Sequence, residues 1–147
     1  MISWEEFSRQ APELAAYGAT RLGDDRVAYL GTLRPDGSPR VHPVTPILGD
    51  ELFIFMEPTS PKGKDLQRDP RYTLHCAVED SSGGKGEFYV RGHARLVQDS
   101  ELRDQALEAA TYEVAERYIL FVLSVEFAFM NIYENGKPNP QRWRASG

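Results

Sequence analysis

Three side chains near the start of one short segment have the chemistry of an anion site. The segment PTSPKGKDLQRDP, residues 58–70, contains Ser60, Lys62 and Lys64. Ser60 is typical of a helix N-cap and Pro61 of the first helical position, so we expect a short helix here. Because a helix N-terminus carries partial positive charge, two lysines in its first turn are unfavourable for the helix but favour a bound anion such as phosphate. The alternative is a pair of solvated lysines on a surface helix.

A second chemical feature is the stretch SPRVHPVTP, residues 38–46, which has strand-forming residues but also three prolines. Proline cannot donate a hydrogen bond to a β-ladder, so we expect an edge strand. Arg40, His42 and Val44 share strand parity and therefore face the same side. Arg40 would bind a phosphate together with Ser60 and Lys62. The alternative interpretation is that Arg40 is a surface arginine beside a hairpin turn. His42 would donate a hydrogen bond near a ligand ring or protonate a substrate. The alternative interpretation is that His42 has a structural role.

A flat ring could lie beside such a phosphate. The strand ELFIFM is expected to run alongside the proline-containing strand. A ring along Pro43, Val44 and Thr45 would then meet Phe55. The chain has no Gly-x-Ser-x-Gly, P-loop or His-Glu-x-x-His motif, so we assign no catalytic residue.

The turn and apolar patterns predict the elements that position these groups. Ser3 and Glu6 have capping-box spacing and begin an amphipathic helix that ends near Gly18. The turn PDGS joins strand 27–34 to the proline-containing strand as a hairpin. Further expected elements are strands at 51–56, 71–78 and 87–98, a loop at 79–87, a second long helix at 100–116, one bent strand or two within 117–134, and a loop-like tail at 135–147. This count of six or seven mostly antiparallel strands predicts an α+β fold, a small β-barrel with peripheral helices.

The bulk composition narrows the class of protein. The 147 residues, 41% of them hydrophobic, fit one domain. A net charge of −5 argues against an open nucleic-acid surface, and no apolar run approaches the ~20 residues of a membrane span. The N-terminus does not have the pattern of a signal peptide. The single cysteine, Cys76, is expected to be a plain buried thiol; together with the absence of metal-site spacing, this predicts a cytoplasmic protein without a metal.

The segment VAYLGTLRPDGSPRVHPVTPIL, followed by LFIFMEPTSPKGKDLQRDPRYTLHC, resembles the pyridoxamine 5′-phosphate oxidase-like, FMN-binding split β-barrel family. The shared pattern is a strand, a D-G turn, PRVxPV, another strand, S-x-K and a helix ending in DPR. The resemblance implies one FMN-binding split-barrel domain over residues 1–147. It implies that Arg40 contacts the flavin phosphate and that the stretch Arg40, Val41, His42, Pro43, Val44, Thr45 lies along the ring. It also implies that Phe55 and Met56 touch the ring and that Ser60 and Lys62 bind the phosphate.

The resemblance implies an oxidoreductase that transfers hydride at the flavin to or from a small molecule. Where pyridoxamine phosphate oxidases proper have an Arg-Lys pair, this chain has Pro61-Lys62. The substrate-binding segments of those oxidases are not evident either, so we do not expect vitamin B6 oxidation. One alternative is a reductase that uses the deazaflavin coenzyme F-420, whose longer anionic tail would also reach Lys64 or Arg68. Others are a non-enzymatic flavin-binding or stress module, and the same fold with an empty site.

The family is typically homodimeric, with cofactor sites built from both chains at the interface. A dimer would explain the polar side of strand 87–98, which carries Tyr89, Arg91, His93 and Arg95. It would also explain the tail residues Arg142, Trp143 and Arg144, with Trp143 contacting the partner's cofactor. The alternatives are a solvated strand face and a tryptophan that anchors the tail.

Overall fold

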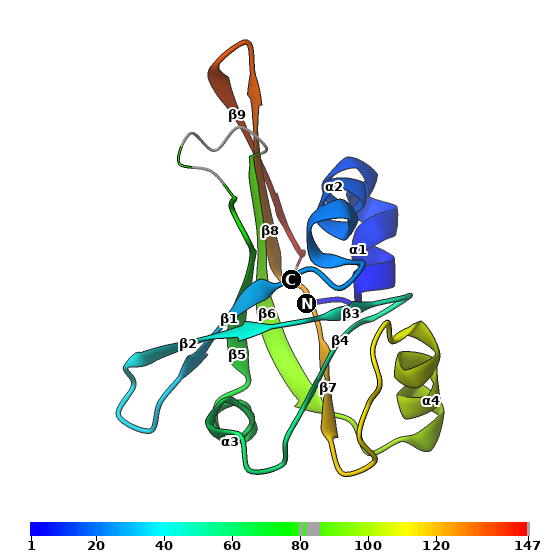
Figure 1. Cartoon of the computed structure of the whole chain (residues 1–147). Helices are drawn as coiled ribbons and strands as arrows, with labels where there is room; N and C mark the ends of the chain where they lie inside the picture. Colours follow the sequence, from blue (N-terminus) through cyan, green and yellow to red (C-terminus); the bar gives the residue numbers. More distant parts are fainter. Residues whose placement is uncertain (80, 82–85, 147) are drawn as a thin grey trace.

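A computed structural model of the chain describes residues 1–79, 81 and 86–146. Its helices are α1 (Trp4–Gln10), α2 (Pro12–Leu22), α3 (Pro61–Arg68) and α4 (Ser100–Ala109) (Figure 1). Its strands are β1 (Ala28–Leu33), β2 (Pro39–Val44), β3 (Ile47–Leu48), β4 (Leu52–Met56), β5 (Arg71–Cys76), β6 (Glu87–Leu96), β7 (Ile119–Leu123), β8 (Phe127–Glu134) and β9 (Lys137–Arg144).

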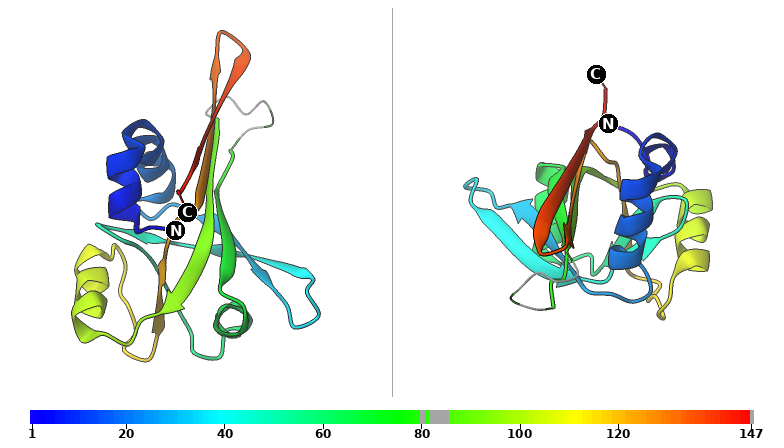
Figure 2. Two further views of the ribbon diagram at one scale, coloured as in Figure 1. Left: turned by 180° about the vertical axis from the view of Figure 1, so that it is seen from behind. Right: turned by 90° about the horizontal axis from the view of Figure 1, so that it is seen from above.

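All the strand pairs are antiparallel, and they follow the order β2-β1-β5-β6-β7-β4-β3. β8 pairs with β6 and β9, so β6 is shared by both halves of the curled sheet (Figure 2). α2 packs against β6 and β8, α3 contacts β1 and β6, and α4 contacts β3. This arrangement confirms the predicted α+β split β-barrel with peripheral helices.

β6 can serve both halves because a glycine lies at its bend. Phe88, Val90 and Ala94 are buried along one side of the strand, as the alternation predicts. Gly92 lies between them, and a Cβ there would sit 2.1 Å from the backbone oxygen of Ser124. Any larger residue would therefore push apart the strands that join at the bend. Beyond this point β6 exchanges β8 for β7 as its partner.

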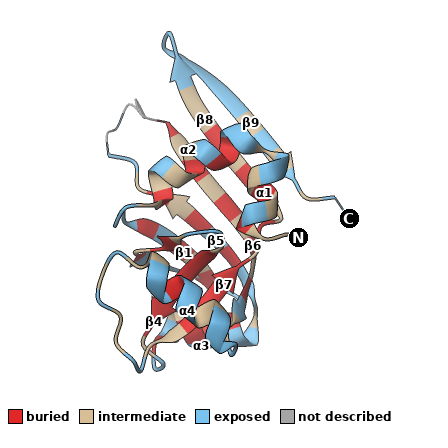
Figure 3. Ribbon diagram, turned by 90° about the vertical axis from the view of Figure 1, so that its right-hand side faces the viewer, coloured by how far each residue is buried: buried red, intermediate tan, exposed pale blue. Residues whose placement is uncertain are grey.

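Two apolar clusters form the core. Figure 3 marks the buried residues along the ribbon in red. The main core fills the space between the barrel and α1–α2. A smaller cluster, here called the α4 cluster, packs α4 against β3, β4 and β7; its buried members are Ile47, Phe53, Phe55, Ala106, Leu120 and Val122. β4 faces both clusters because its alternate residues divide between them, which explains its uninterrupted apolar sequence.

The N-terminal region differs from the predicted single helix. The backbone N–H of Glu6 donates to Ser3 Oγ at 3.1 Å, which confirms the start. Pro12 then opens a second helix that continues to Leu22 instead of ending near Gly18. Proline lacks the N–H that would continue α1, but it is well tolerated in the first turn of a helix.

Three other expectations were wrong. The tail is a strand, β9, because Asn135 and Gly136 both adopt positive φ and turn the chain back along β8. The predicted helix 100–116 ends at Ala109. ELFIFM pairs with β3 and β7 and not with the proline-containing strand. Nine strands are therefore found in the described chain, against six or seven expected.

Part of the predicted loop at 79–87 lies outside the described residues. None of the helices among the described residues is long and apolar enough to cross a membrane.

Candidate functional site

The proline-containing strand is an edge strand, as predicted. β2 pairs with β1 and ends the strand order of the sheet. Arg40 and His42 are half-buried and Val44 is buried, whereas Val41 and Pro43 are exposed on the other side. The predicted common side of Arg40, His42 and Val44 is confirmed, and the opposite side of β2 carries Pro39, Val41 and Pro43.

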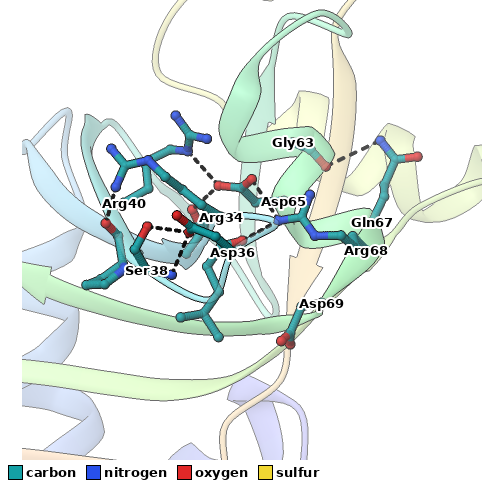
Figure 4. Close-up of polar contacts among 12 residues, drawn as sticks. Arg34, Asp36, Ser38, Arg40, Gly63, Asp65, Gln67, Arg68 and Asp69 are labelled. Carbon is teal, nitrogen blue, oxygen red and sulfur yellow. Dashed lines mark hydrogen bonds and ion pairs between the residues drawn. The ribbon is translucent and has the colours of Figure 1, made fainter.

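The basic side of β2 is tied to α3 through a buried carboxylate (Figure 4). Arg40 Nε donates to Asp65 Oδ2 at 2.6 Å, and Thr32 Oγ1 donates to the same oxygen at 2.8 Å. Arg68 Nη2 donates to Asp65 Oδ1 at 3.0 Å. Burial alone would raise the pKa of Asp65, but the hydrogen bonds from Arg40, Thr32 and Arg68 outweigh it and lower that pKa. Asp65 therefore stays ionised and orients Arg40.

The start of α3 has the features of an anion site. Ser60 is the N-cap, but its side chain makes no capping hydrogen bond. Its Oγ instead accepts from Lys62 Nζ at 2.9 Å. Partial burial lowers the pKa of Lys62, and among the described residues no carboxylate lies within ion-pair distance of it. Lys64, two residues on, is exposed. A half-buried cation without a counter-ion, next to helix amides, is the donor set that binds a phosphate.

His42 lies within the electrostatic field of this cluster. Burial lowers the pKa of His42 first, and the positive charges of Lys62 and Arg40 lower it further. A neutral imidazole at pH 7 is the expected state. Arg40, His42 and Lys62 therefore form a group with more positive than negative charge. Of the three, only Lys62 lines the cavity described next, and the predicted site residues Arg40, Val41, His42, Ser60 and Lys64 are not part of its lining.

A cavity of about 270 Å³ opens between β2, β4 and α3. Six of its lining residues are among those predicted from the sequence: Pro43, Val44, Thr45, Phe55, Met56 and Lys62. Its lining combines aromatic and aliphatic side chains with polar groups, and it carries one cation, Lys62, and one carboxylate, Glu57. Lys62 and the aromatic side chains are the groups that would contact an anionic group joined to a flat ring. The described part of the chain holds no group of three or more His, Cys, Asp or Glu placed to bind a metal.

Three lining residues were not anticipated from the sequence: Glu57, Tyr112 and Tyr118. The tyrosines belong to residues 110–118, here called the 110–118 segment, which connects α4 to β7. Tyr112 lies in a stretch predicted to be helical, and no local pattern connects it to β2 or β4. Its position in the cavity depends on long-range packing in the α4 cluster.

The sheet surface opposite the main core, here called the outer sheet face, is aromatic and basic. One row of directly paired residues on it consists of Val41, Gly31, Thr73, Arg91, Phe127 and Arg144. The next row consists of Pro43, Tyr29, His75, Tyr89, Phe129 and Arg142. Arg91 lies 4.4 Å from the ring centroid of Phe127. Pro43 belongs both to this face and to the cavity, so the two are adjacent.

Trp143 is not near the cavity in this chain. Its register with Ala128 directs it to the core side of β9, where its ring centroid lies 4.9 Å from that of Phe7. Within the chain, Trp143 therefore anchors the C-terminal tail, which is one of its two predicted roles; the other is contact with the partner's cofactor. His93 and Arg95 line a separate cavity of about 500 Å³ together with Glu51.

Comparison with known proteins agrees with the fold. The family model described as pyridoxamine 5′-phosphate oxidase matches residues 18–133. No curated protein sequence matches the chain. Similar solved structures include a heme binding protein from Mycobacterium smegmatis, with 21% identity and a TM-score of 0.65 over 96% of this chain and 58% of that one. General stress protein 26 from Bacillus anthracis shares 17% identity, with a TM-score of 0.65 over 88% and 97% of the two chains. The heme storage protein HutZ from Vibrio cholerae shares 19% identity, with a TM-score of 0.59 over 79% and 89%.

Proposed function

Because the chain belongs to the pyridoxamine 5′-phosphate oxidase family, we propose that it is an FMN-binding oxidoreductase that transfers hydride to or from a small molecule. One observation carries the proposal: β2, β4 and α3 line a single cavity in which Phe55, Met56 and Val44 lie together with the cation of Lys62. The ordered motif through which the sequence resembles this family comes from these three elements and β1.

In this proposal the chain positions the cofactor and the cofactor supplies the hydride chemistry. Lys62 and Ser60 hold the phosphate, together with the first amide groups of α3. Arg40 approaches the phosphate with the guanidinium nitrogens that Asp65 does not engage. Phe55 and Met56 pack against the ring, and the backbone of residues 43–45 borders it.

We place the second protomer of a homodimer on the outer sheet face. Val41 is 66% exposed there and Tyr29 is 44% exposed, so apolar surface remains uncovered in the single chain. Arg91 Nε is buried and has no hydrogen-bond partner among the described residues. Because Pro43 joins this face to the cavity, a partner packed here would complete the site.

The deazaflavin alternative depends on the surroundings of α3. Lys64 is exposed on the same helix and would be open to the longer anionic tail of coenzyme F-420. Arg68 is less suited to that tail, because it already donates to Asp65 and to the backbone oxygen of Leu33. Heme is a third ligand to test, since two of the similar structures are named as heme proteins.

The decisive experiment is a parallel titration of the purified protein with FMN, coenzyme F-420 and heme, followed by fluorescence and absorbance. Tight binding of FMN alone is the expected result. Preference for the deazaflavin or for heme, or binding of none of the three, would contradict the proposal. Reduction and reoxidation of the bound FMN with small-molecule donors and acceptors then separates an enzyme from a non-enzymatic flavin-binding module.

A further inference from the structure

The 110–118 segment forms one wall of the proposed cofactor cavity. Tyr112 and Tyr118 line the cavity together with Phe55, and both tyrosines also pack on the α4 cluster. The segment has no regular secondary structure except a turn near its end. Among the described residues its own backbone N–H groups donate only in the cap at Ala110 and in the turn from Tyr118 to Ala115, so side-chain contacts set most of its position.

Arg103 of α4 supplies the main contact. Its Nη1 donates to the backbone oxygen of Tyr118 at 2.8 Å, and its Nη2 donates to the backbone oxygen of Glu116 at 3.2 Å. The same guanidinium lies 5.2 Å from the ring centroid of Phe55. One planar cation thus joins the 110–118 segment to the β4 wall of the cavity, a geometry that the single ammonium of a lysine does not reproduce.

Two further contacts hold the segment at other points. Arg117 Nε donates to Glu57 Oε2 at 2.9 Å, and the Thr111 hydroxyl donates to Asp25. Glu57 lines the cavity, so its ion pair with Arg117 neutralises the negative charge on this wall. The wall therefore consists of Tyr112, Tyr118 and a carboxylate paired with Arg117, whose guanidinium also lies 5.3 Å from the Tyr118 ring centroid.

The hydroxyl of Tyr112 is suited to donate a hydrogen bond. Partial burial raises the pKa of Tyr112, and the nearby Tyr118 and Asp25 raise it further. The phenol therefore keeps its proton at neutral pH. A protonated phenol donates a hydrogen bond to an oxygen acceptor, and its ring favours a flat apolar surface.

We propose that Arg103 is a positioning residue that holds the 110–118 segment as a tyrosine wall of the cofactor cavity. We further propose that this wall selects flat, uncharged molecules with a hydrogen-bond-accepting oxygen as substrates. The proposal rests on the proposed function for the identity of the cofactor. The link between Arg103 and the segment can be measured without any cofactor.

The first test measures hydrogen exchange of the Tyr118 amide, which donates to the backbone oxygen of Ala115 at 3.0 Å, in the cofactor-free protein. Arg103→Gln removes both charged donors, and exchange should rise about tenfold, as expected for the loss of roughly 1.4 kcal/mol of hydrogen bonding. Arg103→Lys should restore little of the protection. Arg26→Gln, at an exposed arginine outside the cavity, should change nothing. Unchanged exchange in Arg103→Gln would overturn the positioning role.

The second test measures ligand selection by the FMN-loaded protein. Naphthoquinone and naphthoquinone sulfonate serve as a neutral and an anionic probe, and binding is followed by the flavin absorbance. We expect the neutral probe to bind more tightly. The double substitution Tyr112→Phe and Tyr118→Phe should weaken its binding about tenfold, the effect of losing hydroxyl donors while keeping the rings. Tighter binding of the sulfonate, or no effect of the double substitution, would overturn the selection role.

The two tests separate failure of the inference from failure of the proposed function. If the wild-type protein does not bind FMN, the proposed function fails while the exchange experiment still reports on Arg103. If Arg103→Gln releases the segment but leaves FMN affinity and the bound-flavin fluorescence unchanged, the segment is not a wall of the site. In that case the inference fails and the proposed function stands.

Discussion

Arg40 Nε and Asp65 Oδ2 lie 2.6 Å apart and join the edge strand β2 to the short helix α3. The Asp65 side chain is 2% exposed and the Arg40 side chain is 20% exposed. The two nitrogens at the tip of Arg40 make no hydrogen bond with the described residues. The carboxylate therefore holds the arginine in place while the tip is left for a ligand, so the pair both stabilises the fold and shapes the proposed phosphate site.

Removing the carboxylate of this pair should affect stability and binding together. Asp65→Ala leaves a half-buried Arg40 and the buried hydroxyl of Thr32 without their acceptor. We expect a loss of about 3 kcal/mol in the free energy of unfolding, the usual cost of breaking a buried pair. Chemical denaturation of the variant and of Asp104→Ala, an exposed carboxylate on α4, measures the difference. Equal midpoints for the two variants would show that the pair contributes little.

Reversing the charge at the start of α3 should abolish cofactor retention. Lys62→Glu replaces a cation beside Ser60 with an anion, which repels a phosphate. We expect the dissociation constant for FMN to rise about a hundredfold or more, because a charge-assisted hydrogen bond becomes a like-charge contact. The proposed dimer should stay folded, since Lys62 is not on the outer sheet face. Lys137→Glu on β9 makes the same charge change at an exposed position, and unchanged FMN affinity in Lys62→Glu would refute the phosphate site.

Stability should fall as the pH rises above neutral, because of His75. Hydrogen bonding to Cys76 and to Glu87 raises the pKa of His75 to about 9 against the opposing effect of burial. His75 Nε2 lies 2.9 Å from Glu87 Oε2. A raised folded-state pKa stabilises the protein fully below the ordinary value of 6.5, and this stabilisation is lost as the pH rises towards 9. Denaturation midpoints measured over this range should fall in the wild type and fall less in His75→Gln. Parallel profiles would contradict the assignment.

The bend of β6 should tolerate glycine only. In Gly92→Ala the new Cβ would meet backbone atoms of Ser124 that cannot move aside without separating the strands. We expect a loss of about 2–3 kcal/mol of stability, at the upper end of overpacking costs. Gly31→Ala on β1 is a matched control, because its nearest neighbour would be 3.7 Å away. Comparable thermal midpoints for both variants would mean that the bend can relax.

Substitution of Trp143 distinguishes its two interpretations. The contact with Phe7 predicts that Trp143→Ala lowers the free energy of unfolding by about 3 kcal/mol, the typical cost of truncating a large aromatic residue. FMN affinity should then be unchanged at temperatures where the variant is folded. Tyr133→Ala, at an exposed aromatic residue on β8, is the control for stability. A variant of wild-type stability that no longer binds FMN would instead support a contact with the partner's cofactor.

Many local features follow from the sequence alone. Ser3 caps α1 and Pro61 begins α3, because capping and proline preferences depend on the nearest residues. The turn glycine Gly37 adopts φ +86° between β1 and β2. The prolines of β2 exclude it from the middle of a sheet, and strand parity places Arg40 and His42 on one side. Cys76 is a free buried thiol, as its apolar surroundings predict. The N-G pair that turns β8 into β9 was also readable from the sequence, and the tail was wrongly interpreted as a loop.

Only the tertiary structure decided which distant segments meet. The pairing of β4 with β7 and not with β2 depends on contacts more than 60 residues apart along the chain. The partner of Arg40 is Asp65, a choice that no local spacing determines. Tyr112 and Tyr118 reach the cavity through packing of the α4 cluster and the hydrogen bonds of Arg103. Trp143 points to the core because of the β8–β9 register. Local preferences act over a few residues, whereas strand order and cavity walls depend on burial across the whole chain, which local patterns in the sequence do not reveal.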